Sequence, residues 1–247
     1  MVDFGYETVS TMKYTVLLFM ACSTANALMC ASHEEFSYCI SSLDEDNVGL
    51  YWKDKRGEPY RNPINLRHDL AGRGISMSFA MNAGMFKEDL SPMGLLVING
   101  KQLAPINLRS GHTNFYAKPN GVFLVANGVP MILTTTEYQA RHIKPSLATQ
   151  SGPVLVKGGK VLTSSTVSPT SKSMYIRNAV CVFKDRDLAF VISDRPVTMY
   201  RMAEWIANDM KCPDALYLDG GVSMMYTMST RQYEDGPDLG PLLAVFH

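Results

Sequence analysis

Apolar runs in the middle of the chain are separated by short polar turns. Asn99-Gly100, Asn127-Gly128 and Gly158-Gly159 each stand between two such runs. Pairs of this kind tolerate the positive φ angles of two-residue hairpin turns, whose twist matches that of paired strands. A longer polar loop at 184–187 separates a fourth pair of apolar runs. The pattern therefore predicts four antiparallel hairpins.

One segment, 198–210, has helical periodicity instead. Thr198 can cap its start and Pro213 prevents its continuation. The apolar residues that share one face of this helix are Met199, Met202, Ala203, Ile206 and Met210.

The remaining elements are fewer and weaker in the pattern. A shorter helix is predicted at 136–142 and an isolated strand at 48–52. The rest of 28–70 is polar and mixed, with loop-like stretches at 41–47 and 52–63. Residues 222–227 fit either a return strand or the first turn of a helix. We expect a single α+β domain of hairpin-rich, mixed antiparallel sheets with few packed helices.

The N-terminus has the pattern of a secretory signal peptide. After Met12 come a lysine, an apolar stretch at 14–22 and small residues that end at Ala27. The apolar stretch is too short to span a bilayer as a helix. We expect a signal peptide at 1–27 with its true start at Met12, an N-terminal segment at 28–74 and the main domain at 75–247. The mature protein would be periplasmic or secreted.

Charge and composition narrow the class of partner. The chain has 23 Lys and Arg against 23 Asp and Glu, so its formal net charge is zero. This balance gives no electrostatic footprint for nucleic acid and no polybasic membrane patch. A neutral small molecule, or an anion met by one or two local arginines, fits better.

Cleavage after Ala27 would leave four cysteines, which allow two disulfides in three possible pairings. Cys30–Cys39 with Cys181–Cys212 is one plausible pairing. The cysteines and histidines show no spacing typical of a zinc site.

Polar residues stand where several apolar runs end. Asn82 and Asp219 are each followed by glycine within two residues, which suits either a plain turn or the close approach of a ligand. Ser151 lies in a similar place, without the residues of a nucleophile elbow. Arg177 stands among apolar residues, where a cation is costly unless it meets an anion. That anion is either an Asp of the same site or an anionic ligand such as phosphate.

The motifs are more specific together than apart. Their order resembles that of the phosphodiester glycosidase family over residues 75 to 245. The segments that carry the resemblance are Asn82-Ala83-Gly84-Met85-Phe86, 94–101, Asn114-Phe115, 118–123, 148–153, Arg177-Asn178, 190–193 and 216–223.

The resemblance implies an α+β hydrolase that cleaves a sugar-1-phosphodiester. In the uncovering enzyme of that family, the sugar is N-acetylglucosamine. The positions that match the family's motifs are Asn82, Gly84, Ser151, Gly152, Arg177, Asp219, Gly220, Gly221 and Ser223. Residues Ser193-Asp194 depart from the pattern, since the uncovering-enzyme branch more often has Asp-Gly there.

These positions give a mechanistic hypothesis. Arg177 would hold the phosphate, and Asp219 would act at the anomeric carbon as a nucleophile or as a base for water. Asn82 and Ser223 would orient sugar hydroxyls or the phosphate. The backbones at 84, 151–152 and 220–221 would line the pocket. Asp194 and Glu137 are candidates for a second carboxylate, and a divalent cation bound by Asp219 is a variant; no cofactor is otherwise indicated.

Two other classes of function fit parts of the sequence. An exported carbohydrate- or cell-wall-binding module would bind glycans without changing them. A serine hydrolase would use Ser151 or Ser223, although neither has an evident His and Asp arrangement in the sequence. The clustering of polar residues around glycines at predicted strand ends favours an enzyme, although a binding protein could show the same cluster.

Overall fold

The computed structural model describes residues 28–111, 114–228 and 236–247. The predicted signal peptide at 1–27 lies outside the described residues.

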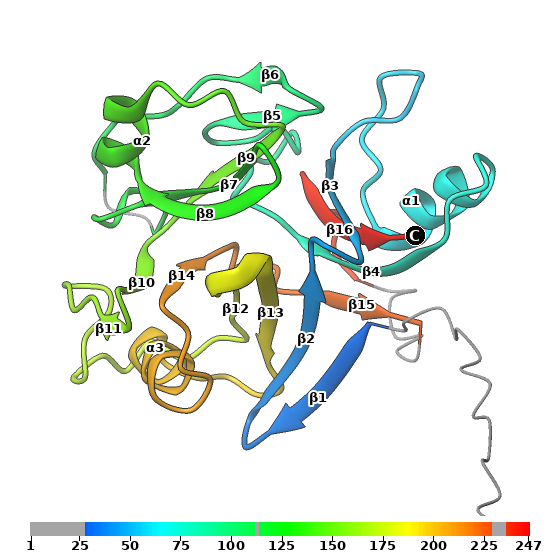
Figure 1. Cartoon of the computed structure of the whole chain (residues 1–247). Helices are drawn as coiled ribbons and strands as arrows, with labels where there is room; N and C mark the ends of the chain where they lie inside the picture. The colour runs from blue at the N-terminus through cyan, green and yellow to red at the C-terminus, as the bar shows by residue number, and fades with distance from the viewer. Residues whose placement is uncertain (1–27, 112–113, 229–235) are drawn as a thin grey trace, which may run out of the picture.

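Within the described residues, sixteen strands form three sheets, and the strand pairs in these sheets are antiparallel. Figure 1 shows how the sheets are arranged. The seven-stranded sheet has the order β1 (Met29–His33), β2 (Phe36–Ser42), β13 (Asp187–Ser193), β12 (Asn178–Val182), β14 (Asp214–Tyr217), β10 (Val154–Lys157) and β11 (Lys160–Val161). The four-stranded sheet has the order β15 (Met225–Thr227), β4 (Met77–Asn82), β16 (Leu242–Phe246) and β3 (Asn47–Tyr51). The five-stranded sheet has the order β6 (Lys101–Ala104), β5 (Leu96–Ile98), β9 (Leu147–Ser151), β7 (Gly121–Ala126) and β8 (Val129–Thr134).

The α-helices of the described part of the chain are α1 (Pro63–Ala71), α2 (Thr135–Arg141) and α3 (Met199–Asn208). The predicted α+β fold is confirmed.

The four predicted hairpins are present as β5–β6, β7–β8, β10–β11 and β12–β13. Asn99 and Asn127 have φ angles of 51°, and the glycine after each has φ above 70°. These are the positive angles that the turn residues predict. Residues 222–227 supply a strand, β15, at their end.

The helix predicted at 198–210 is α3. The Thr198 side chain accepts a hydrogen bond from the Arg201 N–H and caps the helix, as expected. Met202 and Ile206 are buried against the seven-stranded sheet, and Trp205 stacks on Phe36 with ring centroids 4.5 Å apart. This packing fixes α3 on β2.

β1, β2 and α1 begin within residues 28–70, where the sequence pattern predicts only the strand at 48–52. Strand β1 is exposed along its whole length, so its sequence has no apolar alternation, yet it pairs with β2 through five residues. Helix α1 is short and buries only Pro63, Leu66 and Leu70; the Asn62 side chain caps it by accepting from the Asn65 N–H. Both elements depend on contacts that a local pattern does not record.

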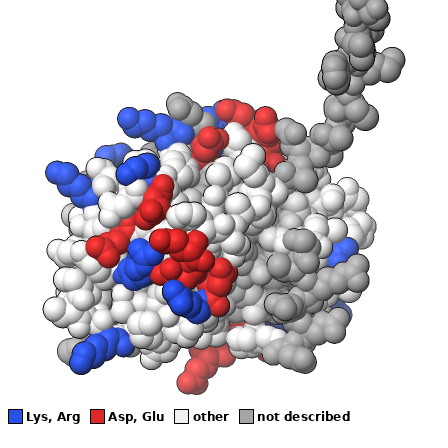
Figure 2. All heavy atoms as spheres, turned by 90° about the horizontal axis from the view of Figure 1, so that it is seen from below, with Lys and Arg blue, Asp and Glu red and all other residues white. Residues whose placement is uncertain are grey.

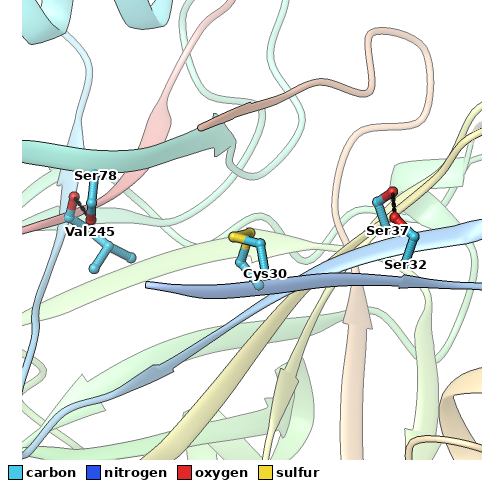
Figure 3. The surroundings of a disulfide bond; sticks show 6 residues. Cys30, Ser32, Ser37, Ser78 and Val245 are labelled. Carbon is cyan, nitrogen blue, oxygen red and sulfur yellow. Dashed lines mark hydrogen bonds between the residues drawn. A yellow bond between two sulfur atoms is a disulfide. The ribbon is translucent and has the colours of Figure 1, made fainter. Parts of the chain in front are cut away.

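Both disulfides of the plausible pairing are formed. Cys30–Cys39 joins directly opposite residues of β1 and β2, beside the Ser32–Ser37 hydroxyl contact (Figure 3). Cys181–Cys212 joins β12 to the segment that leads into β14, and both of its residues are buried.

The surface carries both signs of charge close together. On the face in Figure 2, acidic and basic side chains are interspersed, without a field of one sign. In the described parts of the chain, none of the helices has the length and hydrophobicity needed to cross a bilayer.

Removing the Cys181–Cys212 disulfide should cost more stability than removing Cys30–Cys39. It closes the longer loop, with a separation of 31 residues against 9. Loop-closure entropy gives roughly 3.5 and 2.5 kcal/mol respectively. Urea unfolding of the two double Cys→Ala variants measures the difference. An equal or reversed loss would show that loop length does not dominate here.

Candidate functional site

The candidate site lies where the three sheets meet. Asn82 ends β4 of the four-stranded sheet, Asn178 begins β12 of the seven-stranded sheet, and Ser151 ends β9 of the five-stranded sheet. All three side chains are buried and take part in hydrogen bonds that reach the segment 218–224, which follows β14. This segment carries Asp219.

Asn82 is the centre of the network. Its Nδ2 donates to the Asp219 carbonyl at 3.0 Å, and its Oδ1 accepts from the Met224 N–H at 2.8 Å. The same Oδ1 accepts from Asn178 Nδ2 at 2.8 Å. One buried amide therefore holds both ends of the Asp219 loop and ties two sheets together.

The two serines complete this arrangement. Ser151 Oγ donates to the Leu218 carbonyl at 2.8 Å. Ser223 Oγ lies 3.1 Å from the Asp219 carbonyl and 3.3 Å from Asn178 Oδ1. Ser151 is fully buried, whereas Ser223 is half-buried. The backbone on both sides of Asp219 is thus fixed from several directions.

Asp219 presents its carboxylate from this fixed loop. Its side chain accepts from the Gly221 N–H at 3.0 Å. Burial raises the pKa of the Asp219 carboxyl above its usual value, and the Gly221 hydrogen bond opposes that rise. A carboxylate that is partly desolvated and held by one backbone N–H is suited to act as a nucleophile or base.

Arg177 lies beneath the loop rather than open to solvent. It is 1% exposed, and three of its nitrogens donate to protein groups. Nε donates to the Val197 carbonyl at 2.8 Å, Nη2 to the Ser173 carbonyl at 2.9 Å and Nη1 to the Tyr217 hydroxyl at 3.0 Å. These partners are neutral oxygens, so the Asp partner that the sequence left open is not among the hydrogen bonds of Arg177 to the described residues.

Tyr217 connects Arg177 with the loop. Burial raises the pKa of the Tyr217 hydroxyl to about 12, with Arg177 acting in the opposite direction, so the hydroxyl is neutral at physiological pH. A Cβ on Gly220 would lie 1.3 Å from this hydroxyl oxygen. Only glycine at 220 lets the loop pass over the tyrosine.

The other glycines expected at the site also serve close packing within the protein. A Cβ on Gly84 would lie 2.3 Å from the Gln150 carbonyl, and one on Gly152 would lie 2.6 Å from Asn120 Cβ. Gly221 alone among them is exposed. A substrate-lining role for these glycines stays a prediction.

Sequence reasoning left three residues of this region without a role. All three lie in segments that carry the family resemblance: Asn178 in Arg177-Asn178, Tyr217 in 216–223 and Thr149 in 148–153. Thr149 Oγ1 accepts from the Gly84 N–H at 3.0 Å and joins the five-stranded sheet to the end of β4. A polar residue inside an otherwise apolar strand was the available signal, because such a residue must find a partner.

A hollow of about 760 Å³ lies near the site, on the other side of Gln150. Lys87, Met93, Arg109 and Tyr116 are among the residues that line it, and Asp219 is not. The Gln150 side chain fixes Asn107, which lines the hollow, by accepting from its N–H and donating to its carbonyl. It also accepts from the Leu95 N–H. Gln150 is therefore a structural residue of this rim.

The candidates for a second carboxylate have other partners. Glu137 caps α2, where its carboxylate accepts from Thr134 N at 2.7 Å. Asp194 is exposed and accepts from Ser37 Oγ at 2.7 Å. Neither is among the groups that shift the pKa of Asp219.

The next question is whether the described residues include metal ligands or a histidine beside the two serines. The described residues contain no group of three or more His, Cys, Asp and Glu side chains placed to hold a metal ion. Of the described histidines, His33 pairs with Trp205 and His247 with Asp46, and none contacts Ser151 or Ser223. His112 lies outside the described residues.

Comparisons with known proteins give the relatives and the fold of this chain. The chain is 32% identical over 190 residues to the uncharacterized protein YigE of Escherichia coli K12, covering 77% of this chain and 73% of that protein.

Two solved structures share the fold at low identity. The catalytic domain of zebrafish N-acetylglucosamine-1-phosphodiester alpha-N-acetylglucosaminidase, auto-inhibited by its pro-peptide, matches with a TM-score of 0.57 and 14% identity. The match covers 88% of this chain and 81% of that one. A hypothetical protein from Synechocystis matches with a TM-score of 0.51 and 12% identity, over 89% of this chain and 61% of that one.

The family match covers both the scaffold and the site. The model described as phosphodiester glycosidase matches residues 76–240, a range that runs from the start of β4 to the end of the Asp219 region and beyond. It contains Asn82, Ser151, Arg177 and Asp219. The chain belongs to the phosphodiester glycosidase family.

Proposed function

We propose that this protein is an exported hydrolase that cleaves a sugar-1-phosphodiester at the anomeric carbon. The observation that carries the proposal is the Asp219 carboxylate, partly desolvated and fixed at the junction of three sheets. Family membership supplies the reaction class, and the zebrafish relative is named for cleavage of an N-acetylglucosamine phosphodiester. The two disulfides support an oxidising compartment and hence export.

The chemistry requires one carboxylate near the anomeric carbon. As the bond between that carbon and the phosphate oxygen breaks, positive charge develops on the sugar, and an ionised carboxylate stabilises it. Asp219 would attack the carbon or deprotonate the attacking water. The leaving phosphate monoester is already anionic, so it needs less protonation than an ordinary alcohol.

Arg177 assists the phosphate by its charge rather than by a direct bidentate contact. Its burial and its hydrogen bonds to Val197, Ser173 and Tyr217 support this assignment. A fixed cation in a low-dielectric layer under the loop stabilises negative charge that forms above it. This revises the direct phosphate grip expected for Arg177.

Asn82 and Ser223 were both expected to orient the sugar hydroxyls or the phosphate, and their contacts support different roles. The Asn82 amide donates and accepts within the protein at 2.8–3.0 Å, which supports a positioning role for the Asp219 loop. Ser223 is half-buried, and its hydroxyl oxygen can still accept a hydrogen bond from a sugar hydroxyl. Ser223 is therefore the residue of the pair that contacts substrate.

Replacing Asp219 by Asn should abolish turnover while leaving the fold intact. The amide keeps the shape and an acceptor for the Gly221 N–H, but it cannot supply the negative charge. We expect kcat to fall by at least ~10²-fold. Release of phosphate monoester from a panel of sugar-1-phosphodiesters, with residues 28–247, measures the effect.

Asp187→Asn is the matched control, because Asp187 begins β13 at the end opposite Ser193. It should retain parental turnover. Full turnover by a folded Asp219→Asn protein would exclude the proposed role. Saturable glycan binding without turnover by the parent would identify a binding module instead. Loss of turnover on chelation, restored by a divalent ion, would place a cation at Asp219.

The acid limb of the pH profile should lie above the usual range of an Asp carboxyl. Because burial raises the pKa of Asp219, ionisation and turnover appear only at a higher pH than the ordinary value of 3.8. The same raised pKa means that ionised Asp219 destabilises the fold at neutral pH. Asp219→Asn should then be at least as stable as the parent at pH 7, with the difference vanishing below pH 3.8. Rate profiles and urea unfolding across pH measure both effects, and an acid limb at or below 3.8 would contradict the assignment.

Ser151→Ala separates the proposed mechanism from serine catalysis. The Ser151 hydroxyl donates to the Leu218 carbonyl, so its loss should cost about 1 kcal/mol of stability and lower kcat no more than about tenfold. A nucleophilic serine would instead lose at least ~10³-fold. Steady-state kinetics beside urea unfolding distinguishes the two outcomes.

A further inference from the structure

An exposed aromatic ring lies next to the buried layer of the site. Tyr175 is 55% exposed, and the neighbouring Met174 is 53% exposed. The Tyr175 backbone is nevertheless fixed, because it exchanges two hydrogen bonds with Val197 at 2.9 and 3.2 Å. The ring is thus held at the surface by an ordered backbone.

The ring belongs to a continuous series of contacts that reaches the Asp219 loop. The guanidinium carbon of Arg177 lies 5.4 Å from the Tyr175 ring centroid and 5.5 Å from the Tyr217 ring centroid. The Tyr217 hydroxyl accepts from Arg177 and lies against Gly220, next to Asp219.

The contact with Arg177 distinguishes Tyr175 from other exposed aromatic residues. Single exposed hydrophobic residues are common, and most need no explanation. Here, however, the exposed ring packs on the same cation that supports the catalytic loop. Aromatic rings commonly line small-molecule sites, and the C–H face of a pyranose provides an apolar surface that can pack on such a ring.

We propose that the Tyr175 ring is the platform on which the sugar ring of the substrate packs. The platform orients the anomeric carbon towards Asp219 while Arg177, beneath the loop, faces the phosphate end. The ligand class is a pyranose with an exposed C–H face. The kinetic part of this inference rests on the proposed function, whereas sugar binding at Tyr175 does not.

Kinetics of three variants test the platform. Tyr175→Ala should raise KM for a sugar-1-phosphodiester by about tenfold and leave kcat within about threefold. Tyr175→Phe should keep the parental KM, since the ring carries the effect. Met174→Ala, a neighbouring exposed side chain without an aromatic face, is the matched control and should also keep it. An unchanged KM in Tyr175→Ala, or equal damage from the Phe variant, would overturn the inference.

Binding without turnover separates this inference from the proposed reaction. Saturation-transfer NMR of N-acetylglucosamine and of glucose is measured with the Asp219→Asn protein, which should transfer saturation to the sugar C–H protons. In the double variant Asp219→Asn/Tyr175→Ala, this transfer should be at least ~5-fold weaker. Sugar binding through Tyr175 in a parent that hydrolyses no diester would support the platform and reject the reaction. Hydrolysis with a KM unaffected by Tyr175→Ala would reject the platform and leave the reaction standing.

Discussion

The buried amide of Asn82 is the contact on which the candidate site depends. It holds the Asp219 carbonyl, the Met224 N–H and the Asn178 side chain at once, at the meeting point of two sheets. Leaving any of these buried groups without a partner would cost ~1–3 kcal/mol. The amide therefore fixes the course of the loop with a precision that a solvent-exposed turn does not have. Ser151 extends the same restraint to the third sheet.

Hairpins could be predicted from the sequence because their determinants are local. Asn99-Gly100 and Asn127-Gly128 set both the turn geometry and the strand register within a few residues. Strand β1 lacks such a signal, since it is exposed along its length and is held by pairing with β2 and by Cys30–Cys39. The same limit applies to how the three sheets meet, which depends on contacts between residues far apart in the chain.

The sequence indicated which residues come together in the fold better than which contacts each of them makes. Asp219 was open between a turn and a site, and it is both the start of a tight loop and a partly desolvated carboxylate. Arg177 was expected to meet an anion, but its partners are two carbonyls and a tyrosine hydroxyl. Spacing along a chain shows that a buried cation needs partners, whereas only the fold shows which oxygen atoms supply them.

The candidate site combines a buried layer with an exposed one, and the two layers would suit different parts of the proposed substrate. Arg177 and Tyr217 are buried and can act on a ligand only through charge and through the loop above them. Gly221 and Tyr175 are exposed, and Ser223 is half-buried, so these residues can touch a ligand directly. A reaction in which negative charge collects on the leaving phosphate benefits from a fixed cation that solvent does not screen. In the proposed reaction, direct contacts would be left to the exposed and half-buried residues that recognise the sugar, which differ in chemistry from the buried residues that would stabilise the charge.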